Sequence, residues 1–388
     1  MSAAELCRPF AVMIKPVGSR CNMRCRYCYY LDKGRFSSHP AQTVMRRDLL
    51  EKLIRQAVDS TDGNVISFTW HGGEPTLAGI DFYRQAVSLE KKYCPRGKQI
   101  WNNLQTNGLL INDQWVRFLK ENHFDVGLSI DGTEAVHDAN RPDPAGGGTW
   151  SRVRKAAERL TRAGILPDLL CTVNAKTVTD PVGVYRSLAD LGTGWIQFIP
   201  VVVRNGNILS DESVSADSYG NFLIAVFDEW ARKDLGKLDI QLFAETAKVL
   251  AGGEPSLCWM RGTCGQVPVV EEDGAVYSCD HFVDDAHRLG CLHTQKLKQM
   301  ALSEYQDGFG RSKADNLTAQ CCSCPYLRFC GGGCPKDRFG ISDSGENGQY
   351  ILCSGLKKFW DHAVPVLKWM MQKSRSGCGP DEIMALLD

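Results

Sequence analysis

The sequence has no excess of either charge. Its 45 lysines and arginines balance 45 aspartates and glutamates, which gives a formal net charge of +0 at pH 7. A basic surface is the usual mark of proteins that bind nucleic acid or anionic membranes, and the charge balance gives no sign of one. The sequence also lacks an apolar run long enough to span a bilayer, and its first ten residues lack the hydrophobic core of a signal peptide. We therefore expect a cytoplasmic protein that binds neither nucleic acid nor membrane.

Cysteine, in contrast, is abundant, with 17 residues in a chain of 388. Disulfide frameworks are typical of small secreted domains, whereas clustered cysteines in a reducing compartment indicate metal or redox sites. Ten of the 17 lie between residues 253 and 353, in a region rich in Gly and Asp and poor in periodicity. Such a region cannot build a normal core for its length, so metal or cluster ligation is expected to stabilise it.

The first 235 residues or so alternate short apolar, often β-branched stretches with amphipathic ones. Six β-then-α units of this kind imply a parallel sheet with right-handed crossovers, either an open doubly wound sheet or a partial barrel. One more helix is expected within 239–252 and a terminal helix at 364–371, followed by a peripheral tail beyond residue 374. Strands are predicted at 11–17, 65–70, 99–105, 126–130, 169–173 and 196–202, and helices at 45–58, 81–92, 114–122, 151–163, 181–191 and 217–232.

Three cysteines lie within eight residues, directly after the first predicted strand: Cys21, Cys25 and Cys28. The main alternative is a structural zinc site, but such a site usually has four protein ligands, and no further cysteine or histidine follows nearby. Three thiolates can instead hold three irons of a 4Fe-4S cluster and leave the fourth iron open. Function in parallel βα folds lies at the carboxyl ends of the strands, so this loop is the predicted reaction centre.

The CxxxCxxC spacing, with Tyr27 before the third cysteine, resembles the radical S-adenosylmethionine enzymes. In that family the open iron binds S-adenosylmethionine, which is then cleaved to a 5′-deoxyadenosyl radical. The resemblance implies an α/β fold, with a partial (β/α)6 TIM-like barrel over residues ~10–235. Residues 71–75 (HGGEP) are a weak signal alone, because such turns are common. They are similar to the family's GGEP motif, which implies that Gly72 and Gly73 meet the amino group of the cofactor.

Polar residues also end the third and fourth predicted strands. Gln105 and Ser129 stand there, and Arg141 follows on a loop. Taken alone, these are ordinary strand-terminating turns. The resemblance implies that they hold the ribose, carboxylate and methionyl part of S-adenosylmethionine, and a guanidinium can pair bidentately with a carboxylate. Val202, at the end of the sixth strand, is expected to pack on the adenine, with core packing as an almost equal alternative.

A second array of cysteines extends from residue 258 to residue 353. Paired cysteines of this kind also occur in four-cysteine zinc sites, but eight cysteines suffice for two fully ligated 4Fe-4S clusters. The spacing resembles the SPASM extension of radical peptide-modifying enzymes, so we divide the chain into a barrel (1–238) and a cysteine-rich SPASM domain (239–388). The resemblance implies that Cys258, Cys264, Cys279 and Cys334 hold one auxiliary cluster, and that Cys321, Cys324, Cys330 and Cys353 hold the other.

Six cysteines remain outside these motifs. Cys322 is adjacent to Cys321 and could compete for its role, although the spacing to Cys324 favours Cys321. Cys171 lies in a predicted strand and is expected to be a small buried side chain. No function is predicted for Cys7, Cys94, Cys291, Cys322 and Cys378.

Asp280 directly follows Cys279, and a lone aspartate is usually a solvated charge. The Cys-Asp pair, Tyr30 two residues after Cys28, and the whole cysteine spacing resemble the anaerobic sulfatase-maturating enzymes. These oxidise one Cys or Ser of an unfolded sulfatase to Cα-formylglycine. The resemblance implies that the radical removes a hydrogen from the target Cβ, that Asp280 takes the thiol or hydroxyl proton, and that the remaining electron leaves through the auxiliary clusters. Tyr30 is expected to line the substrate pocket.

The same resemblance implies a monomer that receives electrons from a flavodoxin or ferredoxin-type donor. The alternative is a SPASM enzyme that forms a thioether or carbon–carbon crosslink in a ribosomal peptide. Many such enzymes carry a peptide-recognition domain before the barrel, and only 20 residues precede Cys21. A non-catalytic iron–sulfur or zinc protein is a third possibility, opposed by the three-cysteine loop together with GGEP.

Overall fold

The computed structural model describes residues 10–36, 44–206 and 208–387. Ten strands form the main sheet, and the others pair as two short hairpins, β7 with β8 and β13 with β14. The strands are β1 (Phe10–Ile14), β2 (Val65–Trp70), β3 (Gln99–Thr106), β4 (Asp125–Ser129), β5 (Asp168–Val173), β6 (Trp195–Pro200), β7 (Arg204–Asn205), β8 (Ile208–Leu209), β9 (Asp239–Ile240), β10 (Val269–Val270), β11 (Ala275–Tyr277), β12 (Arg288–Cys291), β13 (Gly340–Ile341) and β14 (Asn347–Gln349).

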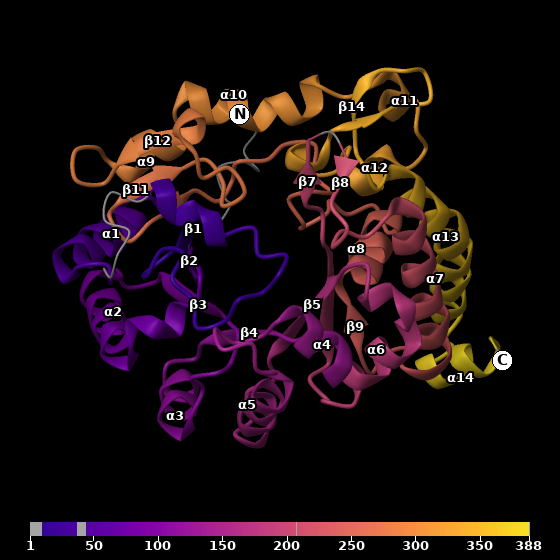
Figure 1. The fold of residues 1–388 in the computed structure, drawn as a ribbon, viewed down its shortest axis with the longest axis horizontal. Coiled ribbons are helices and arrows are strands. Elements are labelled where there is room, and N and C mark those ends of the chain that lie inside the picture. The colour runs from indigo at the N-terminus through magenta and orange to yellow at the C-terminus, as the bar shows by residue number, and fades with distance from the viewer. Residues whose placement is uncertain (1–9, 37–43, 207, 388) are drawn as a thin grey trace.

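The order of strands in the main sheet is β12-β11-β10-β1-β2-β3-β4-β5-β6-β9. Strands β1 to β6 are parallel and adjacent in chain order, as the six predicted units require. β9 extends the sheet beside β6 and β10 beside β1, both in parallel, while β11 and β12 run antiparallel. Within the described ranges β12 and β9 form the two edges, so the sheet does not close into a complete barrel (Figure 1).

Helices alternate with the parallel strands, and further ones follow the sheet. They are α1 (Arg47–Ser60), α2 (Ile80–Tyr93), α3 (Asp113–Glu121), α4 (Glu134–Asn140), α5 (Trp150–Arg162), α6 (Pro181–Ala189), α7 (Ala216–Lys233), α8 (Gln241–Leu250), α9 (Leu297–Ala301), α10 (Glu304–Asp315), α11 (Ala319–Cys322), α12 (Leu327–Cys330), α13 (Cys353–Arg375) and α14 (Pro380–Ala385). Alternate residues of β2 are buried, because successive side chains of a strand point to opposite faces.

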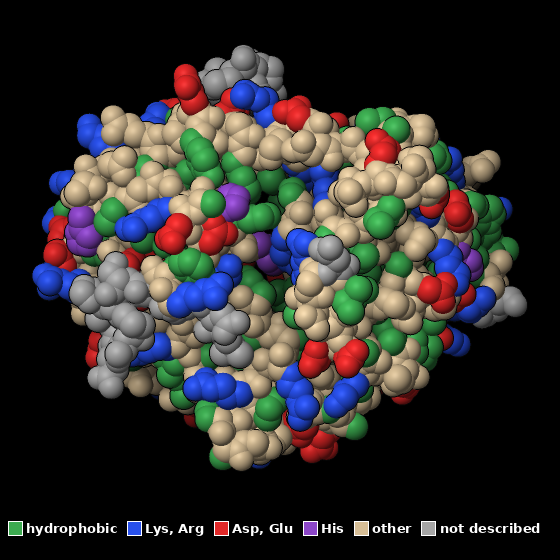
Figure 2. Space-filling model, turned by 45° about the horizontal axis from the view of Figure 1, so that its top comes forward, with side chains coloured by type: hydrophobic (Ala, Val, Ile, Leu, Met, Phe, Trp, Pro, Cys, Tyr) green, Lys and Arg blue, Asp and Glu red, His purple; other side chains and the backbone are tan. Residues whose placement is uncertain are grey.

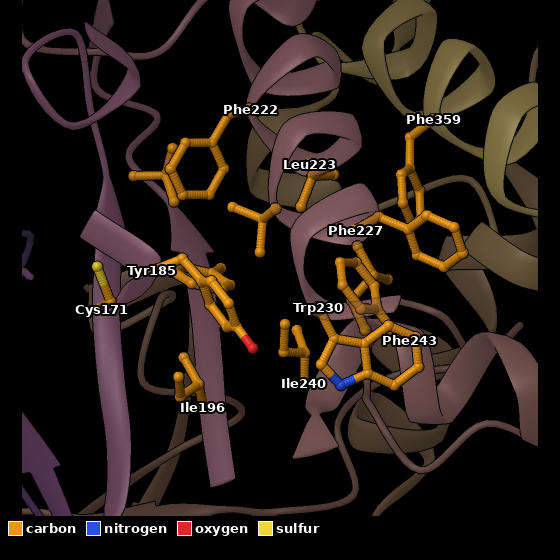
Figure 3. Close-up of a cluster of buried hydrophobic side chains, with 14 of the residues drawn as sticks. Cys171, Tyr185, Ile196, Phe222, Leu223, Phe227, Trp230, Ile240, Phe243 and Phe359 are labelled. Carbon is orange, nitrogen blue, oxygen red and sulfur yellow. The ribbon is translucent and has the colours of Figure 1, made fainter. Parts of the chain in front are cut away.

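The apolar core beside β5 and β6 is completed by helices from both halves of the chain (Figure 3). The rings of Phe243 on α8 and Phe359 on α13 stack with their centroids 5.4 Å apart. Helix α13 lies very close to α7, since a Cβ on Gly355 would be 1.8 Å from the carbonyl oxygen of Ala216. Cys171 is fully buried in this core, as its place in a predicted strand indicated.

Most predicted elements are present, with ends shifted by a few residues, and two expectations were wrong. The terminal helix α13 is far longer than 364–371. The tail is not peripheral, because α14 buries Ile383 and Met384 and contacts α13 and α7. Helix α4 was not predicted, since its seven residues are too few for a clear period. β10 pairs with β1 and α13 packs on α7, so the two predicted domains share a sheet and a core.

Candidate active site

The three-cysteine loop begins where β1 ends. The thiols of Cys21, Cys25 and Cys28 are close enough to interact electrostatically. Burial raises the pKa of Cys21 to about 12 and that of Cys25 to about 11. A buried thiolate is therefore costly unless a cation binds it, and iron is such a cation. The loop thus fits a cluster chemically.

Residues 71–75 lie against this loop. The amide of Gly73 donates to the carbonyl of Gly18, and that of Glu74 to the carbonyl of Arg20, both at 2.8 Å. A Cβ on Gly73 would be 2.0 Å from the carbonyl oxygen of Arg20. Gly72 has φ +127°, a conformation that favours glycine. The two glycines are therefore required here by close contact with the cysteine loop, whatever ligand they also meet.

Two further predicted residues meet at the ends of β3 and β4. The amide nitrogen of Gln105 donates to the hydroxyl of Ser129 at 3.1 Å. Glu74 is buried at the same edge and accepts hydrogen bonds from the Thr106 hydroxyl and the Asn107 amide. Val202 follows β6, is half-buried and packs against the apolar core. The strand ends thus converge as a parallel sheet requires.

Arg141 forms a bidentate ion pair with Asp131, a residue for which no role is predicted from the sequence. Its Nε and Nη2 donate to the two carboxylate oxygens at 2.9 and 3.0 Å, and both side chains are buried. The hydroxyl of Tyr27 donates to the same carboxylate at 2.5 Å. Burial raises the pKa of Asp131, but Arg141 outweighs this effect and holds it below the usual value. The sequence feature that could have pointed to Asp131 was its position directly after a predicted strand.

The eight auxiliary cysteines fall into two spatial sets. In the first set, Cys258 interacts electrostatically with Cys264, Cys279 and Cys334. In the second set, Cys330 interacts with Cys321, Cys324 and Cys353. The second set lines a single pocket together with Trp360 and Tyr350. Cys322 is exposed and lies outside this lining, whereas Cys321 is buried. Within the described ranges, no three His, Cys, Asp or Glu side chains converge on one metal-ion position.

Asp280 lies where the auxiliary cysteines approach the three-cysteine loop. Its Oδ2 accepts a hydrogen bond of 2.6 Å from the Tyr29 hydroxyl, and its Oδ1 is 3.4 Å from Cys279 Sγ. Burial raises the pKa of Asp280, but His281, Lys15 and His71 together hold it well below its usual range. Figure 2 shows a hollow near the middle of one face, with charged and histidine side chains around it.

Lys15 is fully buried near Asp280. The sequence feature that pointed to it was a lysine inside the apolar run 11–17. Its Nζ lies 3.2 Å from His71 Nδ1 and 4.2 Å from the centre of the Tyr30 ring. Tyr30 is itself buried and donates its hydroxyl to Glu271. Tyr29, rather than the predicted pocket residue Tyr30, therefore contacts Asp280.

The N-terminal part of the chain, residues 16–180, matches the Radical SAM superfamily. A serine-type anaerobic sulfatase-maturating enzyme of Bacteroides thetaiotaomicron is 37% identical, with 99% of this chain and 96% of that protein covered. A cysteine-type anaerobic sulfatase-maturating enzyme of Clostridium perfringens is 33% identical, with 92% and 97% covered. The solved structure of native anSMEcpe with bound AdoMet and Cp18Cys peptide has a TM-score of 0.85 at 32% identity, covering 94% of this chain and all of that one.

The chain belongs to the anaerobic sulfatase-maturating enzymes. This membership confirms the predicted family, and the structural match confirms the α/β fold class with its mostly parallel sheet. Similarity to both serine-type and cysteine-type members leaves the target residue open. The roles of individual side chains remain predictions, and Cys7 lies outside the described residues.

Proposed function

We propose that this protein oxidises a cysteine or serine of a sulfatase polypeptide to Cα-formylglycine. The observation that carries the proposal is Asp280, a carboxylate that lies between Tyr29 and the auxiliary cysteine Cys279. The oxidation must dispose of a proton and an electron after a hydrogen atom is removed. Asp280 would take the proton as a general base, and a redox cluster held by the neighbouring cysteines would take the electron.

The chain offers residues for S-adenosylmethionine and three 4Fe-4S clusters. Cys21, Cys25 and Cys28 would hold the radical cluster, with Tyr27, Gly72, Gly73, Gln105, Ser129, Arg141 and Val202 around the cofactor. The two auxiliary sets would each hold one further cluster. When bound, these groups supply the 5′-deoxyadenosyl radical that takes a hydrogen atom from the target Cβ, and they accept the remaining electron.

Asp280 would take the proton of the target thiol or hydroxyl. Tyr29 orients the carboxylate through Oδ2, while Oδ1 faces the Cys279 sulfur at 3.4 Å. The His281 ring packs against that of Tyr29, with centroids 4.8 Å apart and the planes tilted by 31°, and limits the movement of the phenol. Burial lowers the pKa of Lys15, whereas the carboxylates of Asp280 and Glu271 favour its charged form. The protonated Lys15 in turn favours the charged carboxylate of Asp280.

Unfolded sulfatase polypeptide is the proposed substrate, in keeping with the peptide-bound structure of the relative. A flavodoxin or ferredoxin-type protein is the proposed electron donor, and we propose a monomer that acts in the cytoplasm. Among the described helices, none combines the length and apolar character that crossing a bilayer requires.

The test is anaerobic incubation of the reconstituted protein with S-adenosylmethionine, a reductant and peptides bearing a Cys-x-Pro-x-Arg or Ser-x-Pro-x-Arg segment. A carbonyl-trapping reagent with mass spectrometry should report formylglycine in at least one of the two peptides. Formation of 5′-deoxyadenosine without a carbonyl in either peptide would contradict the proposal. A crosslinked peptide would instead support the alternative chemistry of a SPASM peptide maturase.

A further inference from the structure

Lys313, on α10, is a buried cation next to the first auxiliary set. Its side chain is 1% exposed. Its Nζ donates to three backbone carbonyls, those of Cys258 (2.8 Å), Trp259 (2.9 Å) and Arg261. The ammonium also interacts electrostatically with the thiols of Cys258, Cys264 and Cys334. Burial lowers the pKa of Lys313 to about 8, while the three neighbouring cysteines favour the charged ammonium. Lys313 therefore holds the turn that carries Cys258 and places its ammonium beside three predicted ligands.

Arg338 is a second cation, located between the two auxiliary sets. Its guanidinium donates to the carbonyls of Gly331 (3.0 Å), Gly332 (2.8 Å) and Lys313 (2.6 Å). The three glycines 331–333 join Cys330, in the second set, to Cys334, in the first. A Cβ on Gly332 would be 2.5 Å from Arg338 Nη2, so the guanidinium lies directly against this linker.

The charge of these two cations is not balanced by carboxylates. Within the described ranges, neither Lys313 nor Arg338 forms an ion pair with an aspartate or glutamate, and all the hydrogen bonds just described go to carbonyls. Removing a cation from water is costly unless an anion compensates. The neighbours that would become anionic on binding a cluster are cysteines: Arg338 interacts with Cys321 and Cys330 of one set and with Cys334 and Cys264 of the other.

We propose that Lys313 and Arg338 are positioning residues for electron transfer, which raise the reduction potentials of the two auxiliary clusters. The inference rests on the proposed function, in which these eight cysteines hold two clusters. Each cluster becomes more negative by one charge when it takes the single electron left by the oxidation of the substrate. A fixed positive charge nearby stabilises that reduced state, and it does so more strongly in a buried, low-dielectric site.

The two cations are expected to act unequally. Lys313 neighbours only cysteines of the first set in the contacts described, so its charge should act chiefly on that cluster. Arg338 neighbours cysteines of both sets and should act on both clusters. A purely structural role for either residue would depend on its hydrogen bonds to the carbonyls and would leave the potentials unchanged.

The experiment is an anaerobic redox titration of the full-length chain, followed by electron paramagnetic resonance. Cys21, Cys25 and Cys28 are replaced by Ala in every sample, so that only auxiliary clusters give signals. The variants are Lys313→Gln and Arg338→Gln, with Lys313→Arg and Arg338→Lys as charge-retaining partners. Lys120→Gln is the control, because this exposed lysine lies on α3, at the opposite side of the molecule from α10 (Figure 1).

For Lys313→Gln we expect a roughly tenfold lower ratio of reduced to oxidised cluster at a fixed poise, which corresponds to ~59 mV for one electron. This shift should affect one cluster, whereas Arg338→Gln should shift both. The charge-retaining variants and Lys120→Gln should stay close to the parent protein. Potentials unchanged in both neutral variants, with about eight irons retained per chain, would overturn the inference.

If a variant loses a cluster, its iron content is compared with that of the charge-retaining variant. Loss of iron in Lys313→Gln but not in Lys313→Arg would support the inference only if Lys313→Arg also keeps the potentials of the parent protein, because Lys313→Gln loses hydrogen bonds to the carbonyls as well as the charge. Equal loss in both would overturn it for Lys313 and assign the residue to packing. If the parent protein itself holds far fewer than about eight irons, the cluster assignment fails, and the inference fails with it.

Discussion

The hydroxyl of Tyr29 donates a hydrogen bond of 2.6 Å to Oδ2 of Asp280, across 251 positions of sequence. It joins the three-cysteine loop to the auxiliary cysteine region at the carboxylate proposed as the base. Tyr30, the neighbouring residue, faces Lys15 and Glu271 instead. The two adjacent phenols therefore have separate tasks, and they can be tested separately.

Replacement of Asp280 by Asn should abolish most formylglycine formation while 5′-deoxyadenosine is still released. General bases contribute about 10²–10⁴-fold to rate, so a loss of that size is expected. Mass spectrometry with carbonyl trapping measures the product, and iron analysis checks the clusters. Asp285→Asn, at an exposed position five residues away, serves as the control and should keep full turnover. Full turnover in Asp280→Asn would remove the base assignment.

Tyr29→Phe should lower the rate of formylglycine formation by about 10- to 100-fold, because Asp280 loses the phenol that orients its carboxylate, and it should cost no more stability than this one hydrogen bond supplies. The lost hydrogen bond is made to a charged group, and such bonds contribute about 1.5–3 kcal/mol. The matched variant is Tyr30→Phe, which leaves the buried Glu271 without its phenol donor and should mainly lower the free energy of unfolding. The reverse pattern, with activity lost only in Tyr30→Phe, would support Tyr30 as the substrate-pocket residue.

Arg141→Met should destabilise the protein by about 3–5 kcal/mol at pH 7, because it leaves Asp131 buried without its partner. The folded-state pKa of Asp131 lies below its ordinary value of ~3.9, so the pair stabilises the fold fully above that pH. Its contribution is lost as the pH falls through the folded-state value. Anaerobic denaturant titrations should therefore show a difference from wild type that shrinks in acid. Arg152→Met, at a half-exposed 3.9 Å pair, should change stability by less than ~0.5 kcal/mol.

Replacing Cys21, Cys25 and Cys28 together by Ala should lower the iron content from about twelve to about eight atoms per chain. S-adenosylmethionine cleavage should stop, because the open iron is lost with this cluster. Replacing Cys321, Cys324, Cys330 and Cys353 should also remove about four irons, while cleavage of the cofactor persists. Ala at Cys322 should leave the iron count unchanged, since this thiol lies outside the pocket. Zinc in place of iron in the anaerobic protein would contradict the cluster assignment.

Gly73→Ala should displace the cysteine loop, because the new Cβ would meet the carbonyl oxygen of Arg20 at 2.0 Å. Overpacking of this kind costs about 1–3 kcal/mol, measurable as a loss of thermal stability and of iron from the first cluster. Gly308→Ala is the control: it lies in helix α10 with no atom near its Cβ position, and it should stabilise by ~0.5–1 kcal/mol. Equal effects of the two substitutions would show that the contact with Arg20 is unimportant.

Local sequence patterns predicted the elements well where they were long and periodic. The strand at 65–70 has the predicted ends, and the six parallel strands follow chain order. The region between residues 253 and 353 gave no such pattern, because its strands are two to four residues long and its helices α9, α11 and α12 have only four or five residues. β10 could not be foreseen as a neighbour of β1, since two residues carry no period.

The sequence by itself determined the chemistry that this protein can carry: a three-cysteine loop after a strand, a glycine pair after the next, and eight later cysteines with an aspartate among them. These motifs can be recognised in the sequence because each consists of residues that lie close together along the chain. Only the tertiary structure decided which distant residues meet. It paired Arg141 with Asp131, placed Tyr29 against Asp280, and placed Lys313 and Arg338 beside the auxiliary cysteines. Such pairings depend on how the sheet brings strand ends together, and no local period encodes that.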